Sequence, residues 1–281
     1  MKNLIIRTIS GIVYVALIVF VVLFESDTFP TGALLANLFL IVACLALWEY
    51  RNILLQKGIR LSIVFFVASV VIYCAVYAGL VLKMIDFPLV LATTAVMLCV
   101  SMFWELFRKT EQPFTQAALS VVGIFWLIFP FAATMFFPYF DGVCKGESKY
   151  LFLMVFIFLW VYDTLAYCIG SLWGKHRLFE RISPKKSWEG FIGSLLLTLI
   201  LAAFMPKILP ILPLNIPQWL GFAFIIVVFG TLGDLFESLL KRQFEVKDSG
   251  NILPGHGGIL DRFDSFLMVM PVILFYLYII L

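Results

Sequence analysis

Charged residues are scarce in this sequence, and their scarcity excludes an ordinary soluble protein. Only 13% of the 281 residues are charged, whereas 63% are hydrophobic, and the mean hydropathy is +1.07. A soluble domain is typically about 45–50% apolar. The apolar residues form long runs and lack the strict alternation of a membrane β-barrel. The sequence therefore predicts an all-α, polytopic integral membrane protein.

Cysteine and histidine are also few. The five cysteines show neither close pairing nor metal-ligand spacing, and four of them lie within apolar runs, where cysteine acts as a small hydrophobic residue. His256 has no second histidine or cysteine near it in the chain, so a zinc site is not expected. The sequence also lacks a P-loop and a nucleophile elbow. These absences favour direct, metal-assisted transfer over a covalent enzyme intermediate.

Apolar stretches long enough to cross a bilayer as helices recur along the chain. We predict nine: 9–24, 33–50, 61–82, 88–107, 117–139, 150–173, 190–210, 217–240 and 263–281. Lys2 and Arg7 precede the first stretch, but no small-residue cleavage site follows it. We therefore interpret it as an uncleaved span and not as a signal peptide.

The polar segments are too short for a soluble domain, so we expect a single membrane domain over 1–281. Its N-terminal helices occupy 1–149, and a catalytic region with loops 174–189 and 241–262 occupies 150–281. Of the 20 Lys and Arg residues, 16 fall on the side of the N-terminus. The four on the other side are Lys83, Lys145, Lys149 and Lys207. By the positive-inside rule, the N-terminus and both loops are cytoplasmic.

The eighth stretch carries polar residues at helical spacing. Gly230, Asp234, Glu237, Ser238 and Lys241 fall on one stripe of a helix. A carboxylate within an apolar helix is costly and usually marks function. A structural ion pair of the Asp234–Lys241 type is the alternative. Since the stripe leads directly into the charged loop, we favour a functional role.

Other acidic residues within apolar stretches are less decisive. Asp163 shares a face of the sixth stretch with small residues, and a structural acid and a site acid explain it equally well. Glu49 and Glu105 each follow a tryptophan at the end of an apolar stretch. A faint internal repeat is one explanation of these two similar fragments. We favour the other, that both mark the inner membrane interface, where tryptophan and charged residues gather.

Basic residues precede the seventh stretch in an ordered string, Ser183-Pro184-Lys185-Lys186-Ser187-Trp188-Glu189-Gly190. Ser187 is the predicted N-cap of the following helix, with Gly190 at its third position. Lysines beside a helix N-terminus favour an anion site. The alternative to an anion site is that these lysines only set the orientation in the membrane, by the positive-inside rule, and contact lipid headgroups.

The segment before the last stretch is the most charged part of the chain. Asp261 and Asp264 are three residues apart at the start of a predicted helix, so both can face one way. With Asp234 they form an oxygen-rich set, which suits Mg²⁺ together with phosphates. His256 either hydrogen-bonds a phosphate or caps the loop.

The spacing of this segment resembles the signature of the phosphatidate cytidylyltransferase family, also called CDP-diacylglycerol synthases. The matching positions are Ser238, Lys241, Arg242, Lys247, Asp248, Gly250, Pro254, His256, Gly257, Gly258, Asp261, Arg262 and Asp264. The string from Ser183 to Gly190 and the pair Gly233-Asp234 resemble the bacterial type of this family.

The resemblance implies a transfer of cytidylyl from CTP to phosphatidate, with Mg²⁺ and room for a second, monovalent cation. It implies a homodimer in the bacterial inner (cytoplasmic) membrane, with no nucleic-acid partner. Residues expected to be catalytic are Asp234, Asp261, Lys241 and Arg242; those expected to hold metal are Asp234, Asp261 and Asp264. Residues expected to bind substrate are Ser183, Lys185, Lys186, Ser187, Ser238, Lys247, Asp248, His256, Gly257, Gly258 and Arg262. A CTP-dependent lipid kinase and an ion-coupled transporter are the alternatives.

Overall fold

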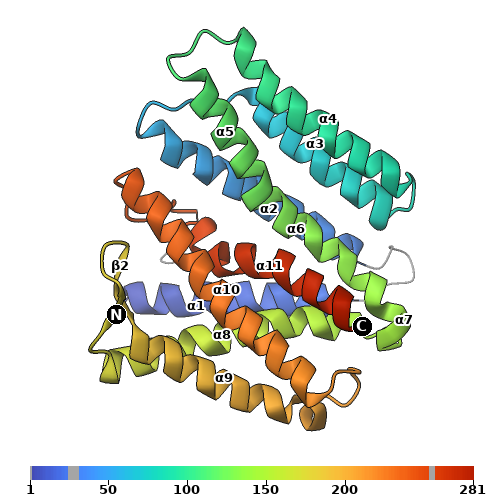
Figure 1. The fold of residues 1–281 in the computed structure, drawn as a ribbon, viewed down its shortest axis with the longest axis vertical. Coiled ribbons are helices and arrows are strands. Elements are labelled where there is room, and N and C mark those ends of the chain that lie inside the picture. Colours follow the sequence, from blue (N-terminus) through green and yellow to red (C-terminus); the bar gives the residue numbers. More distant parts are fainter. Residues whose placement is uncertain (1, 25–31, 253–256) are drawn as a thin grey trace. The chain divides into compact units, whose positions relative to one another are not determined.

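The structure is a computed structural model that describes residues 2–24, 32–252 and 257–281, with side chains from residue 10 onward. Most of it is helical (Figure 1), which confirms the predicted all-α fold. The N-terminal half contains α1 (Lys2–Leu23), α2 (Ala33–Leu55), α3 (Ile63–Leu80), α4 (Phe87–Phe103), η1 (Trp104–Phe107), α5 (Pro113–Gly123), η2 (Ile124–Ile128), α6 (Phe129–Ala133), η3 (Thr134–Phe140) and α7 (Asp141–Cys144). The C-terminal half contains α8 (Ser148–Trp173), β1 (Arg177–Phe179), β2 (Ser183–Ser187), α9 (Trp188–Ile208), α10 (Ile216–Gln243) and α11 (Leu260–Ile280).

Eight helical segments in the described part of the chain are long and apolar enough to cross a membrane. One of them runs through α5 to α7 as a single stretch, Pro113–Cys144, in which π-helical and 3₁₀ turns interrupt the α-helix. Helix α1 contributes a shorter described apolar stretch, Ser10–Leu23. Each of the nine predicted stretches therefore coincides with helix.

A two-stranded hairpin between α8 and α9 was not predicted. Strands β1 and β2 pair antiparallel, with Arg177 opposite Ser187. Pro184 favours an extended backbone, which is compatible with a short, exposed strand. The predicted N-cap is confirmed, because the Ser187 hydroxyl accepts the backbone N–H of Gly190 at 3.1 Å. The hairpin thus leads directly into the start of α9.

The chain forms two compact units, each made of two separate parts of the sequence. The first unit comprises 1–136 and 243–262, and the second comprises 137–242 and 263–281. The segment between α10 and α11 therefore belongs with the N-terminal helices.

Aromatic side chains fill the interior of each unit. In the first unit, Phe39 stacks on Phe131 with ring centroids 5.5 Å apart. In the second unit, Phe158 and Phe222 contact the fully buried Trp219. Burial of such side chains removes large apolar areas from water or lipid and fixes the helices that carry the polar residues.

Candidate active site

The polar stripe on α10 contains one hydrogen bond and one ion pair. Each joins two residues that are four positions apart. The Ser238 hydroxyl donates to Asp234 Oδ1 at 3.2 Å, and the Lys241 ammonium pairs with Glu237. Glu237 is fully buried, whereas Asp234 and Lys241 are partly exposed. These pairs confirm the predicted stripe. Asp234 pairs with Lys186 and Lys241 pairs with Glu237, so both residues of the structural alternative take part in ion pairs, each with another partner.

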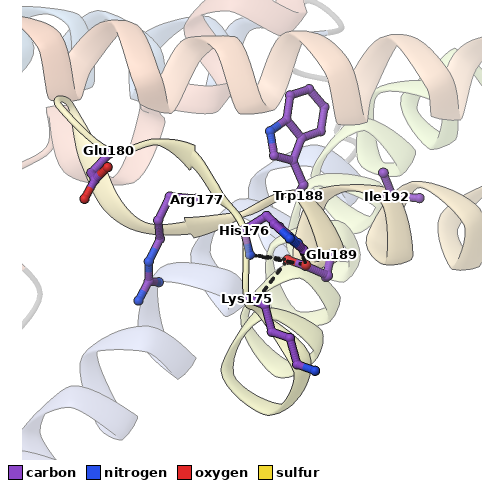
Figure 2. Close-up of a pocket in the computed structure, with 7 residues that line it drawn as sticks. All are labelled: Lys175, His176, Arg177, Glu180, Trp188, Glu189 and Ile192. Atoms are coloured by element: carbon purple, nitrogen blue, oxygen red, sulfur yellow. Dashed lines mark hydrogen bonds and ion pairs between the residues drawn. The ribbon is translucent and has the colours of Figure 1, made fainter.

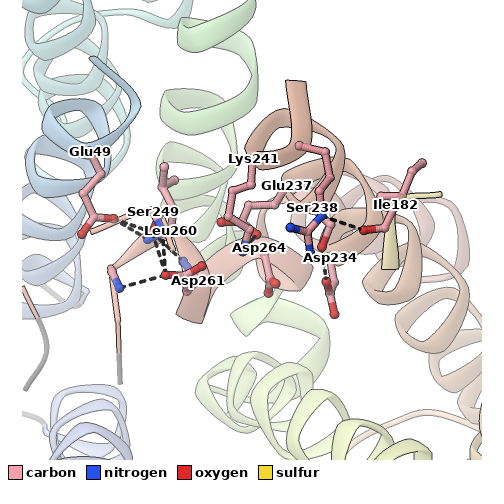
Figure 3. A network of polar contacts seen from close by, with 12 residues as sticks. Glu49, Ile182, Asp234, Glu237, Ser238, Lys241, Ser249, Leu260, Asp261 and Asp264 are labelled. Carbon is pink, nitrogen blue, oxygen red and sulfur yellow. Dashed lines mark hydrogen bonds and ion pairs between the residues drawn. The ribbon is translucent and has the colours of Figure 1, made fainter. Parts of the chain in front are cut away.

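The hairpin supplies a lysine to the α10 stripe. Lys186 Nζ lies 2.7 Å from Asp234 Oδ2, with about a quarter of the lysine side chain exposed. Arg242 Nε donates to the backbone carbonyl of Ile182, in the turn before β2, at 3.2 Å (Figure 3). Two predicted substrate-binding regions, the hairpin and the end of α10, are therefore in contact within the second unit.

Helix α11 approaches α10 closely at Gly233. A Cβ atom at this position would lie 2.5 Å from the Asp264 carbonyl oxygen, so only glycine permits the contact. Asp264 lies where the charges of Asp234, Glu237 and Asp163 act on it. Tyr162 of α8, which is buried, lies 3.2 Å from the Ser265 hydroxyl. Three helices of the second unit thus place carboxylates in one neighbourhood.

The start of the hairpin borders a shallow pocket with a volume of about 870 Å³ (Figure 2). Glu189 lies in this pocket, where its carboxylate accepts the backbone N–H groups of Lys175 and His176, and His176 Nδ1 lies 2.5 Å from Glu189 Oε1. The carboxylate therefore fixes the start of the hairpin to α9. Close approach of Gly174 to Ser187 fixes it to α8.

The glycine-rich segment before α11 surrounds Asp261 in the first unit. Asp261 Oδ2 accepts the backbone N–H groups of Ser249 and Gly258 at 3.0 and 2.9 Å, and the Ser249 hydroxyl at 2.9 Å (Figure 3). Gly257 has a φ of +82°, a left-handed conformation that favours glycine. The two metal carboxylates expected on α11 thus have different neighbours, because Asp264 belongs to the second unit.

Sequence reasoning missed Glu49 as a site residue. This α2 side chain is 2% exposed, and it accepts hydrogen bonds from Ile259, Leu260 and Ser249. Its only signal in the sequence is a carboxylate within an apolar helix, which we interpreted as an interface marker. The structure places it against the segment that contains Asp261.

An exposed ion pair joins the residues that follow α2 to the segment between α10 and α11. Lys57 Nζ lies 2.5 Å from Glu245 Oε1, and the Lys57 ammonium holds the pKa of the Glu245 carboxyl below its ordinary value. Both side chains are well exposed, so solvent screening leaves this pair a small contribution to stability.

The predicted substrate-binding residues and Arg242 differ in their exposure. Exposed in this chain are Lys185, Arg242, Lys247, Asp248 and Arg262. Ser183 is partly exposed, and Ser187 is buried as a helix cap. His256 lies outside the described residues. The exposed basic side chains are in a position to meet a charged ligand from solvent.

The carboxylates fit Mg²⁺ in their chemistry. Asp234 and Asp264 offer hard oxygen donors of the kind that Mg²⁺ takes, and the neighbouring negative charges favour a divalent cation. Among the described side chains, no group of three or more His, Cys, Asp or Glu is already arranged around one point. Magnesium sites usually keep several waters and take further oxygens from substrate phosphates, so few protein ligands are needed.

The sequence matches the model of a known family over almost its whole length. Residues 5–280 match the cytidylyltransferase family. This chain belongs to the cytidylyltransferase family. It is 36% identical over 272 residues to the phosphatidate cytidylyltransferase of Staphylococcus aureus strain COL, covering 95% of this chain and 96% of that protein. The phosphatidate cytidylyltransferase of Staphylococcus haemolyticus is 35% identical over 271 residues, with the same coverage of both chains. That of Staphylococcus saprophyticus is 49% identical over 131 residues, which cover 46% of this chain and 49% of the relative.

Proposed function

We propose that this cytidylyltransferase acts on CTP and phosphatidate, giving CDP-diacylglycerol and pyrophosphate for phospholipid synthesis. The observation that carries the proposal is the full-length match to the family, with relatives of this activity aligned over 95% of the chain. The arrangement of the second unit supports it, because the basic hairpin contacts the polar end of α10. Carboxylates and basic groups together suit two phosphate-bearing substrates and their metal.

In the reaction, a phosphate oxygen of phosphatidate attacks the α-phosphorus of CTP. A new phosphorus–oxygen bond forms, and the bond from the α-phosphorus to the β-bridging oxygen breaks, releasing pyrophosphate. A phosphate monoester is already largely ionised at neutral pH, so no strong general base is needed. The main obstacle is repulsion between the two anions. Lys186, Lys241 and Arg242 would reduce it by binding phosphate oxygens.

The ion pairs that two acids of α10 form suggest how Lys186 and Lys241 act. In the structure, Lys186 neutralises Asp234 and Lys241 neutralises Glu237. Arg242 uses Nε on the Ile182 carbonyl, so its two terminal nitrogens would form the bidentate contact with phosphate. Lys185, which is exposed on β2, would bind phosphate oxygens of the same substrates.

The proposed metal carboxylates are Asp234 and Asp261, together with Asp264, which lies three residues after Asp261. When bound, Mg²⁺ would neutralise phosphate charge and stabilise the leaving pyrophosphate. The role of the chain is to hold these carboxylates in place. Ser238 and Lys186 hold Asp234, and the amides of the glycine-rich segment hold Asp261.

The cellular setting is also proposed. The apolar helices and bacterial relatives support an integral membrane protein. We propose that it lies in the cytoplasmic membrane as a homodimer, with the N-terminus and active site facing the cytoplasm. The lysine and arginine bias between loops supports this orientation. The diacyl tails of phosphatidate would stay in the bilayer while its phosphate reaches the polar residues.

The position of a phosphate label in CTP tests the reaction. Purified protein is incubated with phosphatidate, Mg²⁺ and CTP labelled at either the α- or the γ-phosphate. The proposal expects the α-label in the lipid fraction and the γ-label in pyrophosphate. Entry of the γ-label into lipid would identify a lipid kinase. CTP-independent ion flux in vesicles, without labelled lipid, would identify a transporter.

A further inference from the structure

Glu49 is a buried acid without a basic side-chain partner in the described part of the chain. It is 2% exposed and lies between Trp48, which is exposed, and the buried Tyr50. The described ion pairs of the first unit join other residues. A buried carboxylate needs several hydrogen bonds or a counter-charge to offset the loss of solvation. The identity of its partners therefore indicates what Glu49 does.

Two of the partners are backbone N–H groups where α11 begins: Leu260 is its first residue and Ile259 precedes it. Glu49 Oε1 accepts the Ile259 N–H and Oε2 accepts the Leu260 N–H, both at 2.9 Å. The first N–H groups of a helix have no acceptor within that helix, so an outside group must satisfy them. A carboxylate at this end also interacts favourably with the helix dipole. Glu49 thus caps α11 from a helix about 210 residues earlier in the chain.

Ser249 connects Glu49 to Asp261. Its hydroxyl lies 3.1 Å from Glu49 Oε2 and 2.9 Å from Asp261 Oδ2 (Figure 3). A hydroxyl has one proton, so these two carboxylates share a single donor. The Asp261 N–H in turn points at the Ser249 hydroxyl oxygen at 3.3 Å. A change at Glu49 would therefore reach Asp261 through both Ser249 and the start of α11.

Two glycines leave room for the Glu49 side chain. A Cβ atom at Gly258 would lie 2.6 Å from Glu49 Oε2 and 2.7 Å from Oε1. A Cβ atom at Gly250 would lie 2.8 Å from the carboxyl carbon of Glu49. Both glycines belong to the charged segment whose spacing identified the family. Their small size thus has a specific explanation: the backbone must approach the carboxylate of Glu49.

Glu105 provides a comparison within the same unit. It also follows a tryptophan and is also 2% exposed, but its carboxylate pairs with Arg108, three residues later, at 2.8 Å. Arg108 also donates to Gln116. Glu105 thus has local, charged partners that serve packing. Glu49 holds backbone groups of the segment containing Asp261.

We infer that Glu49 is a positioning residue for the cytidylyl transfer. It fixes the start of α11 and the Ser249 hydroxyl, and through them it holds the Asp261 carboxylate in its working orientation. This inference rests on the proposed function of Asp261. It adds a residue from α2, far outside the charged segment, to the catalytic apparatus. Glu49 itself touches no substrate in this assignment.

The test compares Glu49→Gln with Glu105→Gln, a matched loss of one buried charge. The amide that Glu49→Gln introduces would place an NH₂ group against a backbone N–H, so at least one capping bond is lost. We expect kcat to fall by about 10–100-fold, the range seen when groups that orient a metal ligand are removed. The Mg²⁺ concentration for half-maximal activity should rise, whereas Glu105→Gln should leave both values near wild type.

Hydrogen exchange supplies a readout that does not depend on activity. In Glu49→Gln, the amides of residues 259 and 260 should exchange at least about tenfold faster, because their acceptor is weakened. Amides in the middle of α10 should exchange as in wild type. Glu49→Asp keeps the charge but is one methylene shorter, so we expect a kcat between those of wild type and Glu49→Gln. This variant also covers the case in which Glu49→Gln does not fold.

The outcomes separate the inference from the proposed function. Wild-type kcat together with unchanged exchange in Glu49→Gln would overturn the inference. Equal losses of kcat in Glu49→Gln and Glu105→Gln would also overturn it, because general destabilisation would then suffice. If wild-type protein makes no CDP-diacylglycerol, the proposed function fails, and the exchange experiment still decides whether Glu49 caps α11.

Discussion

Lys186 on the hairpin and Asp234 on α10 form an ion pair, with Nζ and Oδ2 2.7 Å apart. Both side chains are partly exposed, at 25% and 30%. A partly solvated pair contributes little to stability, since solvent screens the attraction. The pair bears on the proposed function, in which Lys186 would bind a phosphate oxygen of the substrates.

The first prediction concerns Lys186. Lys186→Ala should lower kcat/KM for CTP at least about tenfold, a loss of roughly 1.4 kcal/mol of transition-state stabilisation. The melting temperature in detergent should change little, because the pair is partly exposed. Steady-state kinetics with CTP and phosphatidate varied in turn would measure the effect. The control is Lys175→Ala, which removes a neighbouring exposed lysine. An equal loss of kcat/KM in this variant would show that only the total charge of the loop matters.

Arg242 tests the geometry of phosphate binding. Arg242→Lys keeps the charge that orients the protein in the membrane, but it removes the fork that binds two oxygens and the Nε bond to Ile182. We expect kcat/KM to fall at least about tenfold, while membrane insertion is unchanged. The matched variant Arg181→Lys, in the exposed turn between β1 and β2, should behave as wild type. Unchanged kinetics of Arg242→Lys would refute the assigned role.

Gly233 tests the close packing of α10 and α11. In Gly233→Ala, the new methyl group would lie 2.5 Å from the Asp264 carbonyl oxygen, so the two helices would have to separate. Such overpacking typically costs about 1–3 kcal/mol. We expect a lower melting temperature and lower activity. Gly142→Ala places its methyl group in open space and should change neither value.

Orientation in the membrane can be tested by labelling single cysteines in a background without the five native ones. Gly142→Cys should react with a membrane-impermeant maleimide in intact cells, since the lysine and arginine bias places this segment outside. Glu180→Cys, on the exposed hairpin, should react only after the cells are opened. Reaction of Glu180→Cys in intact cells would contradict the proposed topology.

The local parts of the site could be predicted from the sequence. The Asp234–Ser238 and Glu237–Lys241 pairs follow from helical periodicity, and Ser187 follows from the preference for serine at helix starts. Such features depend on residues only a few positions apart. A single sequence contains enough information to place them.

The features that depend on distant residues could not be predicted. Glu49 and Glu105 stand in similar fragments, yet Glu105 binds Arg108 three residues away and Glu49 binds groups about 200 residues away. Arg108 could therefore be proposed as the partner of Glu105 from their spacing, whereas no residue close to Glu49 in the sequence indicates its partners. The hairpin was missed for a related reason, because its two short strands gain stability from α10 and α9 and carry no strong strand pattern of their own.

The capping of α11 by Glu49 has a consequence for the synthesis of the protein. Glu49 is made 210 residues before Ile259, so α2 must enter the membrane while its acceptor oxygens still have no partners. A carboxyl group without hydrogen-bond partners raises the free energy of an apolar helix in the membrane. A chain interrupted before Ser249 would lack all three of the donors that Glu49 has in the structure. Among the described residues, the partners of this early acid are Ser249, Ile259 and Leu260, so its hydrogen bonds are complete once the start of the last helix is in place.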